Sequence, residues 1–168
     1  SLRILSVIEK MLEKENIFII NETEINKEQQ NFIKEFFIQK VSPELVTIIL
    51  NDLDEFPLLK DTSGYLAVKL VMKTKEHPVS DDIIQKNEVR YAVVEIPKTI
   101  NRFVVLPSSS DKQHIILLDD VIRYNLHGIF NIFDYESISG WIEITGFLME
   151  ITGKELYAQE LENVVNKS

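Results

Sequence analysis

The sequence predicts an α+β protein, with a mostly antiparallel sheet of about six strands and about four helices packed on it. Short runs rich in β-branched and aromatic residues recur along the chain, and helical periodicity is confined to segments between them. Several of these runs are separated by loops shorter than the roughly twelve residues that a parallel crossover needs. At 168 residues, with 45% hydrophobic and 27% charged residues, the chain predicts a single globular domain over residues 1–168.

The first segment is predicted to be an amphipathic helix followed by a short strand. Over residues 2–15, apolar side chains recur at three- and four-residue steps, which places them on one helical face. The run at residues 17–20 is β-branched and aromatic and ends at Asn21, which favours a strand.

A second helix is predicted to begin after Asn26. The Asn26 side chain can accept a hydrogen bond from the backbone of Gln29, whose own side chain can reach back, as in a capping box. The apolar positions of this helix share one face: Phe32, Ile33, Phe36 and Phe37. Ser42 followed by Pro43 is typical of a new helical turn, and residues 46–50 predict a strand.

The middle of the chain is predicted to be rich in strands. An acidic loop at residues 52–63 precedes them, and a polar, proline-containing loop at residues 75–87 interrupts them. Pro97 and Pro107 end two of the runs, because proline cannot donate to a sheet. The four predicted strands are residues 65–73, 89–96, 102–106 and 114–118.

The C-terminal part is predicted to return to helices around one further strand. Asp119 or Asp120 is expected to cap a helix that continues through Phe130. An aromatic segment then leads to an alternating strand at residues 141–145. Thr152, with Glu155 three residues later, predicts a capping box at the start of a final helix.

The charge balance restricts the partners that the chain can bind. It carries 18 Lys and Arg residues against 27 Asp and Glu residues, a net charge of −9 at pH 7. A surface of that sign repels nucleic acid and other polyanions unless its basic residues cluster. No stretch approaches the roughly 18 uninterrupted apolar residues of a membrane span, and no segment resembles a leader. We therefore expect no nucleic-acid partner, no membrane span and a cytoplasmic location.

The sequence contains no self-contained active site. It has no cysteine, its five glycines are scattered rather than set in a phosphate-binding loop, and no Gly-x-Ser-x-Gly elbow occurs. The histidines at positions 77, 114 and 127 lack the spacing of metal ligands. We predict no catalytic, cofactor-binding or metal-ligating residue, and no cofactor, in this chain.

Three groups of residues could form a functional site, but each of them also has a purely structural interpretation. The adjacent Asp119 and Asp120 suit either a metal site or the positive end of a helix, and we favour the helix. The acidic residues at positions 52, 54 and 55 lack the ligand spacing of a calcium loop, which favours a solvated face. Four aromatic residues could stack nucleic-acid bases, but acidic neighbours favour a core or partner contact: Phe130, Phe133, Tyr135 and Trp141.

Two basic residues are the best candidates for contacts outside the core. Arg102 opens a predicted strand at a corner limited by proline, and Lys98 lies four residues before it. They could contact phosphate or an acidic partner, and a structural salt bridge is the alternative for Arg102.

A series of short motifs follows in order along the chain. It begins with Glu28-Gln-Gln at the start of a helix and continues through Phe56-Pro57 and Tyr65-Leu-Ala-Val68. Its most specific members are Tyr91-Ala-Val-Val-Glu-Ile-Pro97, Arg102-Phe-Val-Val-Leu-Pro107, Ile115-Ile-Leu-Leu-Asp-Asp-Val-Ile-Arg-Tyr-Asn-Leu126 and Ile129-Phe130. In order and nearly in spacing, the series resembles the middle (head) domain of bacterial polyphosphate kinase.

The resemblance covers residues 5–145 and departs from the family's pattern in two places. Asn101 stands where the family usually has proline, and Gly146 to Met149 replaces a stretch that the family usually begins with arginine and aspartate. The segment after Thr145 therefore carries little of the resemblance.

The resemblance implies that the chain belongs to an enzyme that reversibly transfers the terminal phosphate of ATP to polyphosphate through a phosphohistidine. In that family the phosphohistidine and the Mg²⁺- and phosphate-binding residues belong to domains that follow this one, and an N-terminal domain contributes to the ATP pocket. The resemblance thus implies ATP and Mg²⁺ for the parent enzyme. For this segment it implies a scaffold and dimer-contact role, with other domains of the same polypeptide and a second copy as partners.

An alternative interpretation is a free-standing acidic α+β domain that binds a protein partner. An exposed apolar patch and a reading frame that stops near Ser168 would favour it, whereas several hundred further residues with histidine-containing motifs would favour the kinase. A small-molecule enzyme is a third possibility, which would require a pocket with perturbed titratable groups.

Overall fold

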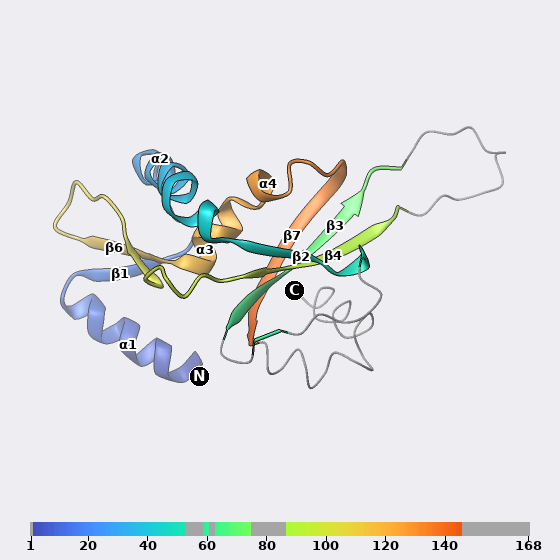
Figure 1. Cartoon of the computed structure of the whole chain (residues 1–168). Helices are drawn as coiled ribbons and strands as arrows, with labels where there is room; N and C mark the ends of the chain where they lie inside the picture. Colours follow the sequence, from blue (N-terminus) through green and yellow to red (C-terminus); the bar gives the residue numbers. More distant parts are fainter. Residues whose placement is uncertain (1, 53–58, 61–62, 75–86, 146–168) are drawn as a thin grey trace. The chain divides into compact units, whose positions relative to one another are not determined.

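The computed structural model describes residues 2–52, 59–60, 63–74 and 87–145 (Figure 1). In that part of the chain seven strands form two sheets, accompanied by four α-helices, which confirms the predicted α+β class. The chain makes two compact units, each from two separate stretches. Residues 1–44 and 97–125 form unit 1, and residues 45–96 and 126–168 form unit 2. Each unit contains one of the two sheets.

Unit 1 contains a three-stranded sheet in the order β1-β6-β5. Its β1 pairs in parallel with β6, and β5 pairs antiparallel with β6. The parallel pair is possible because β1 and β6 are far apart in the sequence, so the length limit on crossovers does not apply to them. The elements of unit 1 are α1 (Leu2–Lys14), β1 (Ile17–Ile20), α2 (Lys27–Phe36), β5 (Phe103–Val105), β6 (Gln113–Leu117) and α3 (Leu118–Tyr124).

Helix α2 begins with the predicted capping box. The Asn26 Oδ1 atom accepts from the Gln29 N–H at 2.8 Å, and Gln29 Oε1 accepts from the Asn26 N–H at 3.0 Å. The chain then continues through a π-helical turn (Phe37–Val41) and a 3₁₀ turn (Ser42–Glu44), the turn expected at Ser42 and Pro43. Ile33 of α2 is fully buried and belongs to the core of unit 1.

Unit 2 contains an antiparallel four-stranded sheet in the order β2-β4-β3-β7. Its central β3 is apolar except for Lys69, because side chains on both of its faces are buried, Leu66 on one and Ala67 on the other. The Tyr65 side chain, also in β3, is only 2% exposed, and its hydroxyl accepts a hydrogen bond from the Lys60 N–H at 3.0 Å. The elements of unit 2 are β2 (Val46–Ile49), β3 (Gly64–Met72), β4 (Val89–Glu95), α4 (Leu126–Ile129) and β7 (Tyr135–Thr145).

The helix predicted from residue 119 to Phe130 is instead two helices. Helix α3 ends at Tyr124, and α4 begins at Leu126. Between them the Asn125 side chain donates to the Val121 carbonyl at 2.7 Å, which occupies an acceptor that a continuing helix would use. The predicted cap is also wrong: Leu117 occupies the N-cap without a side-chain hydrogen bond, and Asp119 and Asp120 lie in the first turn.

Strand β7 begins at Tyr135, six residues before the start predicted for it. The extra residues pair with the far end of the long β3, where Met72 lies opposite Tyr135. The sequence of these residues is polar and contains glycine, so it does not predict a strand by itself. They form one because they pair with β3. The predicted loop at residues 75–87 (but for Asn87) and the predicted final helix after Thr152 lie outside the described residues. None of the helices that the structure describes is both long and apolar enough to span a membrane.

Candidate functional site

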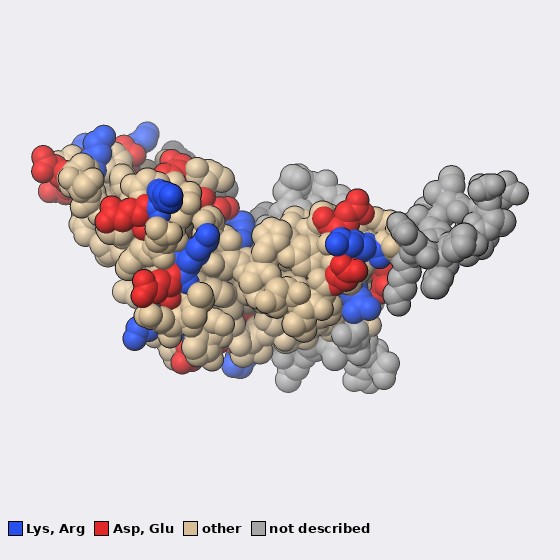
Figure 2. All heavy atoms as spheres, turned by 90° about the horizontal axis from the view of Figure 1, so that it is seen from above, with Lys and Arg blue, Asp and Glu red and all other residues tan. Residues whose placement is uncertain are grey.

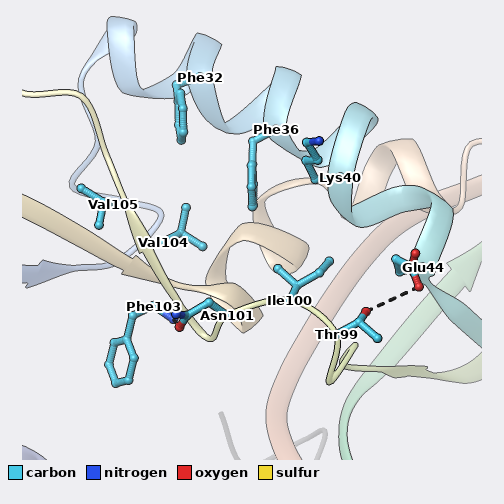
Figure 3. Close-up of a pocket in the computed structure, with 10 residues that line it drawn as sticks. All are labelled: Phe32, Phe36, Lys40, Glu44, Thr99, Ile100, Asn101, Phe103, Val104 and Val105. Atoms are coloured by element: carbon cyan, nitrogen blue, oxygen red, sulfur yellow. Dashed lines mark hydrogen bonds between the residues drawn. The ribbon is translucent and has the colours of Figure 1, made fainter.

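An apolar groove of about 510 Å³ lies within unit 1, between α2 and the segment of residues 99–105 (Figure 3). The Phe32 and Phe36 rings extend from α2 toward that segment, and they stack with centroids 5.9 Å apart. They are presented here because α2 buries Ile33 and leaves the neighbouring side of the helix partly open. The lining residues are Phe32, Phe36, Lys40, Glu44, Thr99, Ile100, Asn101, Phe103, Val104 and Val105.

The groove runs beside the open edge of the sheet of unit 1. Leu118 N donates to the Arg102 carbonyl, and Leu106 N donates to the His114 carbonyl, so the even-numbered residues of this segment face β6. The backbone groups of Phe103 and Val105 therefore point away from β6, and Asn101 Oδ1 accepts from the Phe103 N–H at 3.0 Å. The Phe103 and Val105 side chains are 50% and 52% exposed. An apolar edge strand of this kind is a surface for another polypeptide.

The two predicted contact residues lie in the connection that enters β5. Arg102 Nη2 lies 3.8 Å from Asp119 Oδ1, so the structural alternative for this residue, a salt bridge, is present. Lys98 is exposed and makes an interaction of its own. Six of the ten residues that line the groove are apolar, and among the four polar ones the Thr99 hydroxyl makes a long contact with Glu44 Oε2 at 3.5 Å. The chemistry of the groove suits hydrophobic contact better than phosphate binding.

A buried hydrogen-bond network joins α2 to β6 and to the end of β5. Gln29 is 1% exposed, and its Nε2 lies 3.2 Å from the Pro107 carbonyl and 3.0 Å from His114 Nδ1. Since Gln29 Oε1 is held by the Asn26 N–H, the amide must present its NH₂ group to His114. His114 Nδ1 is therefore an acceptor, and its proton lies on Nε2.

A cluster of charged side chains links the turn after β1 to α3. Arg123 Nη1 lies 2.5 Å from Asp120 Oδ1 and 3.6 Å from Glu22 Oε1. Burial, then the negative charges of Glu22 and Asp119 and a hydrogen bond with Glu22, raise the pKa of Asp120 to about 7, while Arg123 opposes the rise. Sequence reasoning singled out the two aspartates and missed Glu22, which is about a hundred residues away along the chain and carries no local motif.

The remaining sequence candidates have structural surroundings. Phe130 is fully buried, and its ring centroid lies 6.2 Å from that of Phe133. These two rings therefore pack against each other and do not form a surface for stacking bases. His127 Nδ1 lies 2.6 Å from the Tyr135 hydroxyl. Among the residues that the structure describes, no three histidine or acidic side chains are grouped to hold a metal ion. His77, Asp54, Glu55 and the side chain of Trp141 lie outside the described part.

Acidic and basic side chains are interspersed on the face drawn in Figure 2. The described residues on that face form no extended basic area of the kind that attracts a polyanion. The lack of an extended basic area on this face is in keeping with the net charge of −9.

Comparison with known proteins identifies the family. The family model described as the polyphosphate kinase middle domain matches residues 28–142. The chain belongs to this family. The middle domain is 33% identical over 133 residues to a polyphosphate kinase of Vibrio vulnificus and 35% identical over 133 residues to that of Escherichia coli K12. Each of these alignments covers 76% of the chain and 17% of the relative, so the chain spans about one sixth of their length.

The fold of the middle domain also matches a solved structure. The crystal structure of polyphosphate kinase from Porphyromonas gingivalis aligns with a TM-score of 0.61 over 78% of this chain and 19% of that one. At 21% sequence identity the match supports the fold alone.

Proposed function

We propose that this chain is a scaffold within a polyphosphate kinase that reversibly transfers the terminal phosphate of ATP to polyphosphate through a phosphohistidine. The observation that carries the proposal is the match of residues 28–142 to the middle domain of that family. On this proposal the phosphohistidine, the ATP site and the Mg²⁺ site belong to other domains of the same cytoplasmic enzyme. The chain supplies a rigid support and a contact surface.

The described contacts of unit 1 support a scaffold role. The buried Gln29 side chain bonds to His114, and the Arg123 guanidinium contacts carboxylates of the chain itself. Groups engaged in this way hold elements together, whereas a phosphate site needs basic side chains directed at the ligand.

The chain by itself is expected to lack phosphotransfer activity. Incubated with ATP, Mg²⁺ and polyphosphate, the purified 168-residue chain should form no phosphoenzyme and should not lengthen polyphosphate, because the family's histidine is expected on another domain. Radiolabelled ATP followed by gel separation measures both products. The full-length enzyme is the positive control, and polyphosphate synthesis by the isolated chain would contradict the proposal.

We further propose that the open edge of β5 and the adjoining groove form the dimer contact of the middle domain. Phe103 and Val105 expose apolar side chains on the edge strand of this sheet, a surface that a second copy can cover. In the full-length enzyme, Phe103→Asp is expected to weaken dimerisation by at least tenfold, because it buries a charge at the contact. Sedimentation velocity across a concentration series measures the effect.

Ile132→Asp is the matched control for this experiment. Ile132 is 85% exposed and lies in unit 2, in the turn between α4 and β7 and outside the proposed contact, so its substitution should leave the dimer unchanged. If Phe103→Asp leaves the dimer intact but lowers activity, the β5 edge contacts another domain of the same chain and the dimer assignment is wrong.

A further inference from the structure

Three carboxylates and two arginines lie close together around helix α3. Glu22 comes from the turn after β1, where Asn21 Oδ1 accepts from the Thr23 N–H at 2.9 Å and holds the turn in place. Asp119 and Asp120 come from the first turn of α3, and Arg123 lies one turn further along the same helix. Arg102 comes from the residue before β5. All five residues belong to unit 1.

The hydrogen bonds within this cluster are incomplete. Arg123 Nη1 is bonded to Asp120 Oδ1 at 2.5 Å and lies 3.6 Å from Glu22 Oε1, beyond hydrogen-bond distance. Arg102 Nη2 approaches Asp119 Oδ1 only to 3.8 Å. Within the described residues, Glu22 Oε2 and Asp119 Oδ1 are buried carboxylate oxygens without a hydrogen-bond donor. A buried acceptor without a donor is costly, so the cluster as ionised lacks at least one proton donor.

We propose that Asp120 is protonated and donates its proton to Glu22, one of whose buried carboxylate oxygens otherwise has no donor, and that this hydrogen bond fastens the turn after β1 to the first turn of α3. The shared proton supplies the missing donor and lowers the negative charge of the cluster from three carboxylates to two. Two carboxylates then face two guanidinium groups, so the charges balance. Loss of the proton leaves Asp120 and Glu22 as neighbouring carboxylates in a partly buried place, with the Arg123 guanidinium bonded to Asp120 alone.

The charged groups around Asp120 favour its protonated form. The groups that face Asp120 are Glu22 from the turn after β1 and Asp119 and Arg123 from α3, with Arg102 reaching Asp119 from the β5 side. Desolvation by burial and the two neighbouring carboxylates raise the pKa of Asp120 from 3.8 to about 7.

The raised pKa sets the sign of the pH dependence. Because the folded state binds the proton more tightly than the unfolded chain, the stabilisation is complete below about pH 4 and is lost as the pH rises to about 7. Unit 1 is therefore held more firmly at mildly acid pH than at alkaline pH.

The test compares unfolding of the wild-type chain with Asp120→Asn, whose amide donates to Glu22 at every pH. The ratio of the wild-type unfolding constant to that of the variant is expected to rise by about tenfold per pH unit between pH 5 and 7 and to level off above pH 8. Urea unfolding followed by circular dichroism measures it. Asp111→Asn, at an exposed position in the same unit, is the matched control and should give a ratio independent of pH.

A direct titration keeps the proposal falsifiable if a variant does not fold. In the folded wild-type chain, the side-chain carboxyl carbon of Asp120 should titrate near neutral pH by NMR, and Glu22→Gln should move that titration to lower pH by removing a neighbouring charge. A titration of Asp120 near its ordinary 3.8, or an unfolding ratio that stays flat between pH 5 and 8, would overturn the proposal.

Discussion

Replacing Gln29 with alanine is expected to lower the free energy of unfolding of unit 1 by about 3 kcal/mol, because three hydrogen-bonding groups lose their partner in a partly buried place. The groups are the Asn26 N–H, the Pro107 carbonyl and His114 Nδ1, which lie 3.0 to 3.2 Å from the Gln29 amide. The side chain also fills space at 1% exposure, so a cavity adds to the loss. Urea unfolding monitored by circular dichroism measures the change.

Two further variants separate the causes. Gln29→Met keeps the volume of the side chain but removes its hydrogen bonds, and most of the loss should persist. Gln39→Ala removes a glutamine whose only described hydrogen bond, to Glu35, is exposed, so it should cost no more than about 0.5 kcal/mol. If Gln29→Met were as stable as the wild type, packing rather than hydrogen bonding would account for the burial of Gln29.

Phe130→Ala is expected to lower the free energy of unfolding of unit 2 by about 3 to 5 kcal/mol. The Phe130 side chain is fully buried directly after α4, and its N–H donates to the Leu126 carbonyl at 3.1 Å. Its loss would leave a cavity beside the Phe133 ring, whose centroid lies 6.2 Å away, and a close-packed interior fills such a cavity only in part. The measurement is denaturant unfolding followed by the fluorescence of Trp141, the only tryptophan, which belongs to β7 of the same unit.

The matched control is Ile132→Ala, two residues away. Ile132 is 85% exposed, so its truncation should change stability by less than about 0.5 kcal/mol. Equal losses from the two substitutions would mean that Phe130 lies outside the core of unit 2.

The sequence predicted those elements whose causes are local. The capping box at Asn26 and Gln29 involves residues three apart, and the strand at residues 17–20 is bounded by its own composition, so both match the structure. The antiparallel pairing of β5 with β6 likewise follows from the short loop between them.

The features that the sequence did not predict depend on distant residues. The parallel pairing of Ile17 with Gln113 has no local signature, and the first half of β7 is a strand because β3 extends beside it. The same reason applies to the candidate sites. Arg102 was predicted as a contact residue from its position at the start of a strand. Its salt-bridge partner Asp119 could not be predicted in this way, and neither could the approach of Glu22 to Arg123, because tertiary packing produces both contacts.

The interleaved order of the two units has a consequence for how the protein is made. Residues 1–44 emerge from the ribosome without β5 and β6, and residues 45–96 must follow before unit 1 can complete its sheet. Unit 2 in turn lacks β7 until residue 145 is synthesised. Neither core can therefore close until the second half of this chain has been synthesised, and its apolar strands stay exposed until their partners follow, which favours slow folding. A chain cut at residue 96 would contain one of the three described strands of unit 1 and three of the four described strands of unit 2.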